Sequence, residues 1–455
     1  MEKRERLSSR IGFILISVGC AVGLGNVWRF PYITGKYGGA AFVLIYLVFL
    51  AILGLPIMVM EFSVGRASQR SAARSFHVLE PKGSKWHIAS WLIMAGNYVL
   101  MMFYTTVAGW MLIYIKKMVA GEFAQETVDT GAVFNEMLGS PTGMVGGMLV
   151  VVVLGTLVCS IGLQKGVERI TKWMMSLLFV ILLVLCVRSV TLPGAGEGLA
   201  FYLVPDFSKI TEAGIGNVLY AAMGQAFFTL SLGIGAMAIF GSYVNRERSL
   251  TGEALNVCVL DTVVAFLAGL IIFPACFAFD VNPGEGPGLV FVTLPNIFQQ
   301  MAGGRIFGTL FFVFMSFAAL STVIAVFQNI ISFYQDLLGF GKRKAAIVNG
   351  IVIAILSIPC ALGFNLWSGV QPLGFDIQGF EDFIISNNIL PIGSLIYLVF
   401  CTWRYGWGWK KFTEEADSGK GLKFPKWSRV YVAYILPVIV LVIFVMGYLQ
   451  AFGGR

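Results

Sequence analysis

The chain has 455 residues and a formal net charge of +8, with 57% hydrophobic and only 12% charged residues. A soluble protein carries roughly a quarter charged residues, so this composition, with a mean hydropathy of +0.82, excludes an ordinary soluble domain. The net positive charge does not require a nucleic-acid partner, because most Lys and Arg residues flank the apolar segments described below.

Apolar runs of about twenty residues recur along the chain, each long enough to cross a hydrocarbon core of roughly 30 Å as a helix. A transmembrane β-barrel would show short segments of alternating polarity instead. The sequence therefore predicts an all-α polytopic membrane protein in which residues 1–455 form a single transmembrane domain. The eleven predicted spans cover residues 11–36, 41–66, 88–118, 143–163, 167–190, 213–243, 251–278, 303–338, 345–362, 380–404 and 430–450.

The basic residues predict the orientation in the membrane. With the N-terminus in the cytoplasm, 24 of the 32 Lys and Arg residues fall in cytoplasmic segments or at the span ends beside them. An excess of Lys and Arg marks cytoplasmic loops. We therefore expect a multi-pass protein of the plasma (inner) membrane with a cytoplasmic N-terminus and, after eleven spans, a C-terminus on the extracellular side.

The first span is interrupted by residues that weaken a membrane helix. The stretch CAVGLGNVWRFPY, residues 20–32, contains Gly23 and Gly25, followed by Asn26, Arg29 and Pro31. Unwound backbone at membrane depth must line a cavity inside the protein, because lipid offers it no hydrogen bonds. For the two glycines taken alone, close helix packing is the alternative explanation.

The sixth predicted span carries a matching interruption, TLSLGIGAM at residues 229–237. If spans one to five (about 8–190) and six to ten (about 213–405) form two halves, the breaks occupy corresponding positions. Since five is odd, the halves have opposite topology, and the eleventh span, about 430–450, lies outside the repeat. Glycine-interrupted spans at matching places in inverted halves indicate the central site of a transporter.

The breaks also predict what such a site can hold. N–H groups at a helix break suit an anionic group, and carbonyl oxygens suit a cation. A zwitterion accompanied by sodium, a hard cation that prefers oxygen, satisfies both. Asn26, Thr229 and Asp261 place further oxygens at bilayer depth, and a carboxylate inside a membrane is a functional candidate because its burial is costly.

On these motifs the chain resembles the neurotransmitter:sodium symporter family over nearly all of residues 8–450. AVGLGNVWRFPY and QAFFTLSLGIGAM are similar to the family's first-span and sixth-span signatures. The chain looks most similar to the bacterial eleven-span branch that carries hydrophobic and aromatic amino acids. The resemblance implies an inverted five-plus-five repeat with discontinuous helices one and six. It also implies a sodium-coupled symporter that imports a hydrophobic or aromatic L-amino acid by alternating access.

The resemblance implies two sodium sites and no organic cofactor, and it leaves open whether one or two ions are coupled. The first site, completed by the substrate carboxylate, takes Ala21, Asn26, Thr229 and Asp261. The second takes three backbone carbonyls and two hydroxyls, from Gly19, Val22, Ala318, Ser321 and Thr322. From the residues alone, the more ordinary use of these two hydroxyls is a hydrogen bond to a carbonyl about one turn earlier.

By resemblance, the substrate class depends on Gly23. Relatives that carry monoamines have aspartate at this position, so glycine indicates a substrate that brings its own carboxylate. The implied substrate contacts are Ala21, Leu24, Gly25, Leu100, Tyr104, Phe228, Thr229, Ser231, Ile234, Thr322 and Val326. Because this set holds no charged side chain, we expect Leu, Met, Val, Phe, Tyr or Trp. The choice among them stays open, since a methylene changes binding by only about 1–3 kcal/mol.

The resemblance also implies two gates that close the site from opposite sides, each with an Arg–Asp ion pair. The outer gate comprises Arg29, Asp382 and Gln225, and the inner gate comprises Arg4, Asp336 and Tyr243. For Arg4, the alternative is that the basic N-terminal segment binds anionic lipid headgroups.

The chain departs from the family pattern at two places. Chloride-dependent relatives have Asn at the position of Asp261 and Ser at that of Ala265, so we expect chloride independence, with the carboxylate supplying the charge. Whether Asp261 also exchanges a proton stays open. Gly166 is followed by Ser176, where relatives often have a proline linked to unwinding of the fifth span. A helix without that proline keeps its N–H group and should hold more firmly.

Other functional classes find less support in the sequence. It contains no GxxxxGK[ST] nucleotide-binding loop and no Ser/His/Asp arrangement, so it predicts no enzyme. The seven cysteines form no paired motif, and we expect the two histidines, His77 and His87, to be solvated rather than metal-binding. A sodium-dependent sensor without net transport, or a sodium channel, remains as the alternative. The expected partners are an amino acid and the lipid bilayer, and the expected state is a monomer.

Overall fold

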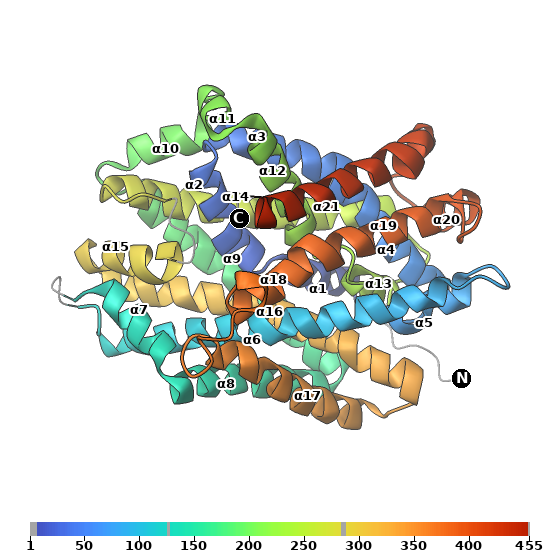
Figure 1. Cartoon of the computed structure of the whole chain (residues 1–455), viewed down its shortest axis with the longest axis horizontal. Coiled ribbons are helices and arrows are strands. Elements are labelled where there is room, and N and C mark those ends of the chain that lie inside the picture. Colours follow the sequence, from blue (N-terminus) through green and yellow to red (C-terminus); the bar gives the residue numbers. More distant parts are fainter. Residues whose placement is uncertain (1–6, 125–127, 284–287, 454–455) are drawn as a thin grey trace.

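The computed structural model describes residues 7–124, 128–283 and 288–453, which form an almost entirely helical protein (Figure 1). Within these ranges the one extended pairing is an isolated bridge between Arg248 and Lys420. The prediction of an all-α fold is confirmed.

Nine helices, or runs of helices, in the described residues are long and apolar enough to span a membrane. They are α3–α4 (Ala40–Ser68), α6 with its first turn (Trp86–Ala120), α8 (Pro141–Ile161), α9 with its first turn (Leu163–Val190), α14 (Leu250–Ala278), α16 (Gly304–Leu338), α17 (Lys342–Leu362), α18–α19 (Ile377–Thr402) and α21 with its first turns (Lys426–Phe452). Each matches a predicted span to within a few residues. The other two predicted spans, the first and the sixth, are broken.

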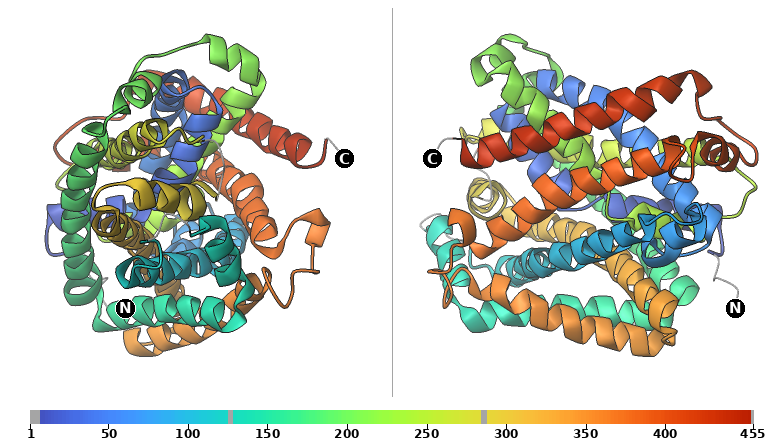
Figure 2. Two further views of the ribbon diagram at one scale, coloured as in Figure 1. Left: turned by 90° about the vertical axis from the view of Figure 1, so that its left-hand side faces the viewer. Right: turned by 45° about the vertical axis from the view of Figure 1, so that its right-hand side comes forward.

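The spans lie side by side, and α6 and α16 pack together in the middle (Figure 1). The neighbours α8 and α17 form one edge, away from α21 (Figure 2). We call the side on which α1 begins the N-terminal side; α5 (Ala72–Leu79) and α20 (Trp409–Ala416) lie there (Figure 1). The short helices α7 (Thr130–Gly139), α10 (Ala195–Leu203) and α15 (Leu294–Gln300) lie on the opposite side, where α21 ends (Figures 1 and 2).

The first span consists of two helices that meet at an angle of 54°. The first, α1 (Arg10–Ala21), ends because Val22 takes an extended conformation, with φ −67° and ψ 105°. The chain resumes as a π-helical turn, Gly25–Arg29, and continues as α2 (Phe30–Lys36). Pro31 fits there because the first turn of a helix does not need its N–H group. The predicted break at Gly23 and Gly25 is confirmed.

The sixth span is divided into α12 (Ile215–Thr229) and α13 (Ala236–Gly241), neither long enough to cross a membrane alone. Between them, Ser231, Gly233 and Gly235 have φ angles of 50°, 88° and 67°, in a region that glycine enters without strain. A Cβ atom on Gly233 would lie 2.4 Å from the carbonyl oxygen of Leu390. The unwound segment therefore packs directly on the backbone of α19 (Leu390–Thr402).

Buried side chains of neighbouring helices supply hydrogen bonds to the unwound backbone. The Gly233 N–H donates to the carboxylate of Glu61, on α4 (Leu55–Ser68). The Ile234 carbonyl accepts from the amides of Asn97, at 2.8 Å, and Asn329, at 3.4 Å. Glu61, Asn97 and Asn329 are all buried. Because these partners replace the missing helical bonds, the break is tolerated inside the protein.

A buried ion pair fixes α20 against the N-terminal side of the bundle. Arg66, at the end of α4, is 1% exposed and donates through Nε to Oε1 of Glu415 at 2.7 Å. It also donates to the carbonyl of Arg248 at 2.8 Å. The other carboxylate oxygen accepts from the more exposed Arg246 at 2.6 Å.

We predict that Arg66→Ala destabilises the protein strongly, because it removes the buried cation beside the Glu415 carboxylate and leaves only the more exposed Arg246 as its charged partner. Removing one member of a buried ion pair costs about 3–5 kcal/mol. The measurement is the thermal unfolding of purified protein in detergent. The matched control is Lys410→Ala on the same short helix, since that lysine is exposed and lies 4.0 Å from Glu414; its loss should cost about 1 kcal/mol or less. Equal melting temperatures for the two variants would contradict the anchoring role.

Candidate functional site

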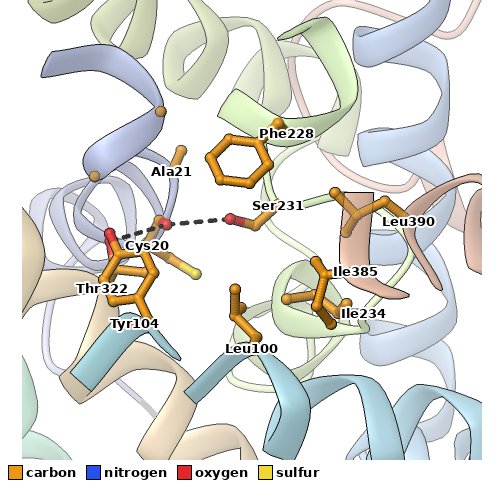
Figure 3. A pocket seen from close by; sticks show the side chains of 12 residues that line it. Cys20, Ala21, Leu100, Tyr104, Phe228, Ser231, Ile234, Thr322, Ile385 and Leu390 are labelled. Carbon is orange, nitrogen blue, oxygen red and sulfur yellow. Dashed lines mark hydrogen bonds between the residues drawn. The ribbon is translucent and has the colours of Figure 1, made fainter. Parts of the chain in front are cut away.

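A small cavity lies where the two helix breaks face each other (Figure 3). Its lining comes from the breaks themselves and from α6, α16 and the α18–α19 run. The lining residues are Cys20, Ala21, Gly23, Gly25, Leu100, Tyr104, Phe228, Ser231, Ile234, Thr322, Ile385 and Leu390. No Asp, Glu, Lys or Arg belongs to this lining in the described part of the chain.

The cavity has a polar side and an apolar side. The hydroxyls of Tyr104, Thr322 and Ser231 lie toward the end of α1, whereas Ile234 and Ile385 lie across the cavity from it (Figure 3). The Tyr104 hydroxyl accepts a hydrogen bond from the Leu24 N–H at 3.1 Å. An amphipathic molecule with a polar head and an apolar side chain fits this division.

The glycines of the first break allow the chain to approach the cavity closely. A Cβ atom on Gly23 would lie 2.3 Å from the hydroxyl oxygen of Tyr104 and 2.7 Å from that of Thr322. A Cβ atom on Gly25 would lie 2.9 Å from the ring of Phe228. Any side chain at Gly23 would therefore displace the hydroxyls on the polar side of the cavity.

Eight of the eleven predicted substrate contacts line this cavity, and three do not. Leu24 lines a neighbouring hollow, and the Thr229 hydroxyl is directed to Asp261. Val326 is fully buried on α16 outside the lining. Four residues of the lining were not among the predicted substrate contacts: Cys20, Gly23, Ile385 and Leu390. Ile385 and Leu390, in the tenth span, could not be recognised from the local sequence, because apolar residues occur throughout any membrane-spanning helix.

Asp261, Asn26 and Thr229 meet beside the cavity, as predicted. Asp261, on α14, is fully buried. Its Oδ1 accepts from Nδ2 of Asn26 at 2.8 Å, and its Oδ2 accepts from the Thr229 hydroxyl at 3.0 Å. Both partners are neutral, and no salt bridge reaches this carboxylate within the described residues. Since a buried ion without a counter-charge costs several kcal/mol, the arrangement fits a bound cation.

The Thr322 hydroxyl forms a second oxygen-rich point. Its oxygen lies 3.3–3.5 Å from four backbone carbonyl oxygens, those of Gly19, Cys20, Val22 and Ala318. One hydroxyl proton can serve only one of these acceptors, so the other oxygens surround a position suited to a hard cation. The neighbouring Ser321 hydroxyl donates to the Ala318 carbonyl at 2.9 Å. This is the hydrogen bond to a carbonyl about one turn earlier that the sequence analysis gave as the alternative to sodium binding.

Away from the N-terminal side, Phe228 separates the cavity from a larger hollow, and it lines both. The Arg29 guanidinium lies 4.5 Å from the centre of the Phe228 ring. The predicted direct ion pair of Arg29 with Asp382 is not formed in the described residues. Instead, Arg29 donates to the Ser386 hydroxyl at 3.1 Å, and that hydroxyl donates to Asp382 at 2.8 Å. Ser386 lies one helical turn after Asp382 and therefore occupies the space between the two charges.

On the N-terminal side, Asp336 near the end of α16 is tied to the start of α5. Its Oδ2 accepts from the N–H and the hydroxyl of Ser71, at 2.7 and 2.6 Å. Its Oδ1 accepts from Arg70 at 3.2 Å. The predicted partner Arg4 lies outside the described residues. Asp336 thus joins two spans on this side through groups that the sequence analysis did not name.

The remaining predicted gate residues, Gln225 and Tyr243, make interior hydrogen bonds. Gln225 donates to the carbonyl of Gly25 at 2.8 Å rather than to Arg29, because α12 packs directly on the first break. The Tyr243 hydroxyl accepts from Gln328 at 2.9 Å.

The fifth span begins with a wide turn and then continues as a regular helix. A π-helical turn, Leu163–Glu168, precedes α9 (Arg169–Val190), which runs through Ser176 without a break. The Glu168 carboxylate accepts from the N–H and the hydroxyl of Ser8, at 2.8 and 2.6 Å. The start of α1 is thereby attached to the fifth span.

Comparisons with known proteins agree with this architecture. Residues 4–137 and 136–452 match the model of the sodium:neurotransmitter symporter family. The chain is 34% identical over 450 residues to the uncharacterized sodium-dependent transporter YhdH of Bacillus subtilis (strain 168), covering 97% of each. It is 28% identical over 506 residues to the sodium-dependent serotonin transporter of Drosophila melanogaster, covering 99% of this chain and 78% of the relative.

The fold is also similar to a solved structure, that of MhsT in complex with L-phenylalanine. The TM-score is 0.88 at 39% sequence identity, over 98% of this chain and 100% of the other. This match and the family model agree with a multi-pass membrane fold, and the family is one of transporters rather than enzymes. The chain belongs to the sodium:neurotransmitter symporter family.

Proposed function

We propose that the protein imports a hydrophobic or aromatic L-amino acid together with sodium, by alternating access. The observation that carries this proposal is the two-sided cavity between the helix breaks, flanked by the oxygen clusters at Asp261 and Thr322. A zwitterion needs both N–H groups and carbonyl oxygens, which unwound helices supply together. The complex of MhsT with L-phenylalanine supports the same substrate class.

The substrate lies, in this proposal, with its charged end against the end of α1. The N–H groups of Leu24 and Gly25 and the Tyr104 hydroxyl receive the carboxylate, since a helix N-terminus favours an anion. Carbonyls of the two breaks receive the ammonium group. The side chain faces Leu100 and Ile234, and these surfaces offer no charge to meet a charged side chain.

Sodium is proposed to bind at both oxygen clusters. At the first, Asp261 supplies the charge, with Thr229 and the Ala21 carbonyl. Asn26 now directs its amide nitrogen to Asp261 and accepts from the Gly23 N–H through Oδ1; a half-turn of the amide directs the oxygen to the ion. At the second cluster, the Thr322 and Ser321 hydroxyls join the carbonyls of Gly19, Val22 and Ala318.

In this proposal, one gate closes the cavity on the N-terminal side of the protein, and the other closes it on the opposite side. Phe228 beneath Arg29 is the outer lid, and the bonds of Asp336 to Ser71 and Arg70 close the inner side. The excess of Lys and Arg beside the spans on the N-terminal side supports a cytoplasmic position for that side. We propose a monomer in the plasma membrane, in which one chain supplies both sodium sites and both gates.

We also propose that transport is independent of chloride, and the position of Asp261 supports this. Its carboxylate is fully buried beside the first cluster, and Ala265 one turn later offers no hydroxyl for an anion. A fixed negative charge beside the ion leaves no need for chloride there.

The test is transport into proteoliposomes that contain the purified protein. Labelled leucine, phenylalanine and tryptophan are followed under an inward sodium gradient, with chloride or gluconate outside. We expect accumulation above equilibrium that requires the gradient and is the same with either anion. Liposomes without protein, and proteoliposomes with equal sodium on both sides, are the controls.

The other outcomes separate the rival functions. Sodium-dependent binding without accumulation would replace the symporter with a sensor. Sodium flux without a fixed ratio to amino acid would replace it with a channel.

We predict that Gly23→Ala weakens sodium-dependent amino-acid binding at least tenfold, because the added methyl displaces the Tyr104 and Thr322 hydroxyls. Binding of labelled tryptophan to protein in detergent measures this effect. The matched control is Gly224→Ala on α12, where an added Cβ meets nothing within 4 Å. Unchanged binding in Gly23→Ala would show that the substrate occupies another site.

We predict that Asp261→Asn lowers the apparent sodium affinity at least tenfold, because it removes the only formal charge of the first cluster. Adding Ala265→Ser should restore part of the uptake in chloride but not in gluconate. Thr262→Val is the control, since its hydroxyl donates to the Cys258 carbonyl within the same helix. A sodium dependence of Asp261→Asn equal to that of the unaltered protein would remove Asp261 from the site.

A further inference from the structure

The connection between α5 and α6 brings together the only two histidines of the chain. Nδ1 of His77 lies 3.1 Å from Oε1 of Glu80, and Nδ1 of His87 lies 2.8 Å from the same oxygen. The three candidate ligand atoms all lie within 4.8 Å of one another. This connection is on the N-terminal side, far from the substrate cavity.

The local chain geometry accounts for this convergence. His77 is in the last turn of α5, and Glu80, three residues later, follows the helix end on the same face. The chain then reverses through Gly83, which has a φ of 82°, and a short 3₁₀ turn, Trp86–Ile88, returns His87 to Glu80. Residues ten apart in sequence thus surround one carboxylate.

The carboxylate is held in place by a second set of hydrogen bonds. Oε2 of Glu80 accepts from the His87 N–H at 3.1 Å and from the Ser84 hydroxyl at 3.3 Å. These bonds leave Oε1 directed between the two rings. The Glu80 side chain is 8% exposed, whereas those of His77 and His87 are 62% and 43% exposed. A fixed carboxylate at the base of two solvent-facing imidazoles resembles the oriented ligand set of a metal site.

We propose that His77, Glu80 and His87 bind one zinc ion, with the fourth position open to water. Zinc takes nitrogen and carboxylate oxygen ligands at about 2.0–2.2 Å, so tetrahedral ligands are separated by about 3.3 Å. The nitrogen–oxygen separations in the structure are slightly shorter, 3.1 and 2.8 Å, and the two nitrogens lie within 4.8 Å of each other, so rotation of the exposed rings would bring the three ligands into this geometry. Two imidazoles with one carboxylate select zinc over sodium, magnesium or calcium, which prefer oxygen alone.

Competing ligands are few elsewhere in the protein. Six of the seven cysteines are buried, and the seventh, Cys186, is half-buried. Within residues 7–124, 128–283 and 288–453, no other group of three His, Cys, Asp or Glu side chains meets the same spacing. The ion would join the end of α5 to the start of α6, whereas Ser71 at the other end of α5 bonds to Asp336.

The test is metal titration of the full-length protein in detergent, without a polyhistidine tag and after removal of metals by a chelator. Calorimetry with zinc should show one ion per chain with a micromolar or lower dissociation constant. The visible spectrum with cobalt should show tetrahedral nitrogen and oxygen ligation without thiolate bands. The double variant His77→Ala/His87→Ala should bind at least a hundredfold more weakly, and Glu80→Gln at least tenfold. Glu122→Gln, which alters an exposed acid paired with Lys117, is the matched control.

Two results would overturn the proposal. One is the absence of saturable binding to the unaltered protein at micromolar zinc. The other is equal binding by the double histidine variant, or thiolate bands with cobalt, which would place the metal on cysteine. Because both histidines are exposed, circular dichroism should show the double variant folded, so its loss of binding reports on the ligands.

Discussion

The structure depends on one constraint, that backbone N–H and C=O groups inside a membrane must find partners within the protein. Two spans leave the helical pattern at mid-membrane, and each break is surrounded by polar side chains from other helices. The Gly25 carbonyl is met by Gln225, and the Ile234 carbonyl is met by Asn97. These partners are fully buried in a protein whose other helix faces are mostly apolar. The core of the bundle is organised around the breaks, and the unbroken spans enclose them.

The same constraint explains which polar groups remain available to bind an ion or a substrate. Groups that the protein itself does not pair fully are the ones available to an ion or a zwitterion. The Thr322 hydroxyl can serve only one of the four carbonyls around it, and Asp261 has only neutral partners. Both points adjoin a cavity whose described lining has no charged side chain, so the charges of the proposed zwitterion would be met by backbone dipoles, hydroxyls and ions.

The two barriers around the cavity differ in construction. Toward the side away from the N-terminus, a single ring, that of Phe228, separates the cavity from a large hollow, with Arg29 placed above it. Toward the N-terminal side, Asp336 on α16 accepts hydrogen bonds from Ser71 and Arg70 at the start of α5. The first is a side chain under a guanidinium that Ser386 links to Asp382, and the second is a set of hydrogen bonds between α16 and the start of α5.

The sequence by itself determined the helical class, the eleven segments to within a few residues and both breaks, whereas eight of the cavity's lining residues were expected only from the resemblance to the family. It could do so because a membrane span needs a long apolar run and because glycine and polar residues at mid-span have few other uses. Only the tertiary structure decided that Ser386 stands between Arg29 and Asp382, that Ile385 and Leu390 complete the cavity, and that both histidines meet at Glu80. These facts depend on how separate helices pack, and an apolar side chain in a span, or a histidine in a loop, carries no mark of the neighbour it will meet.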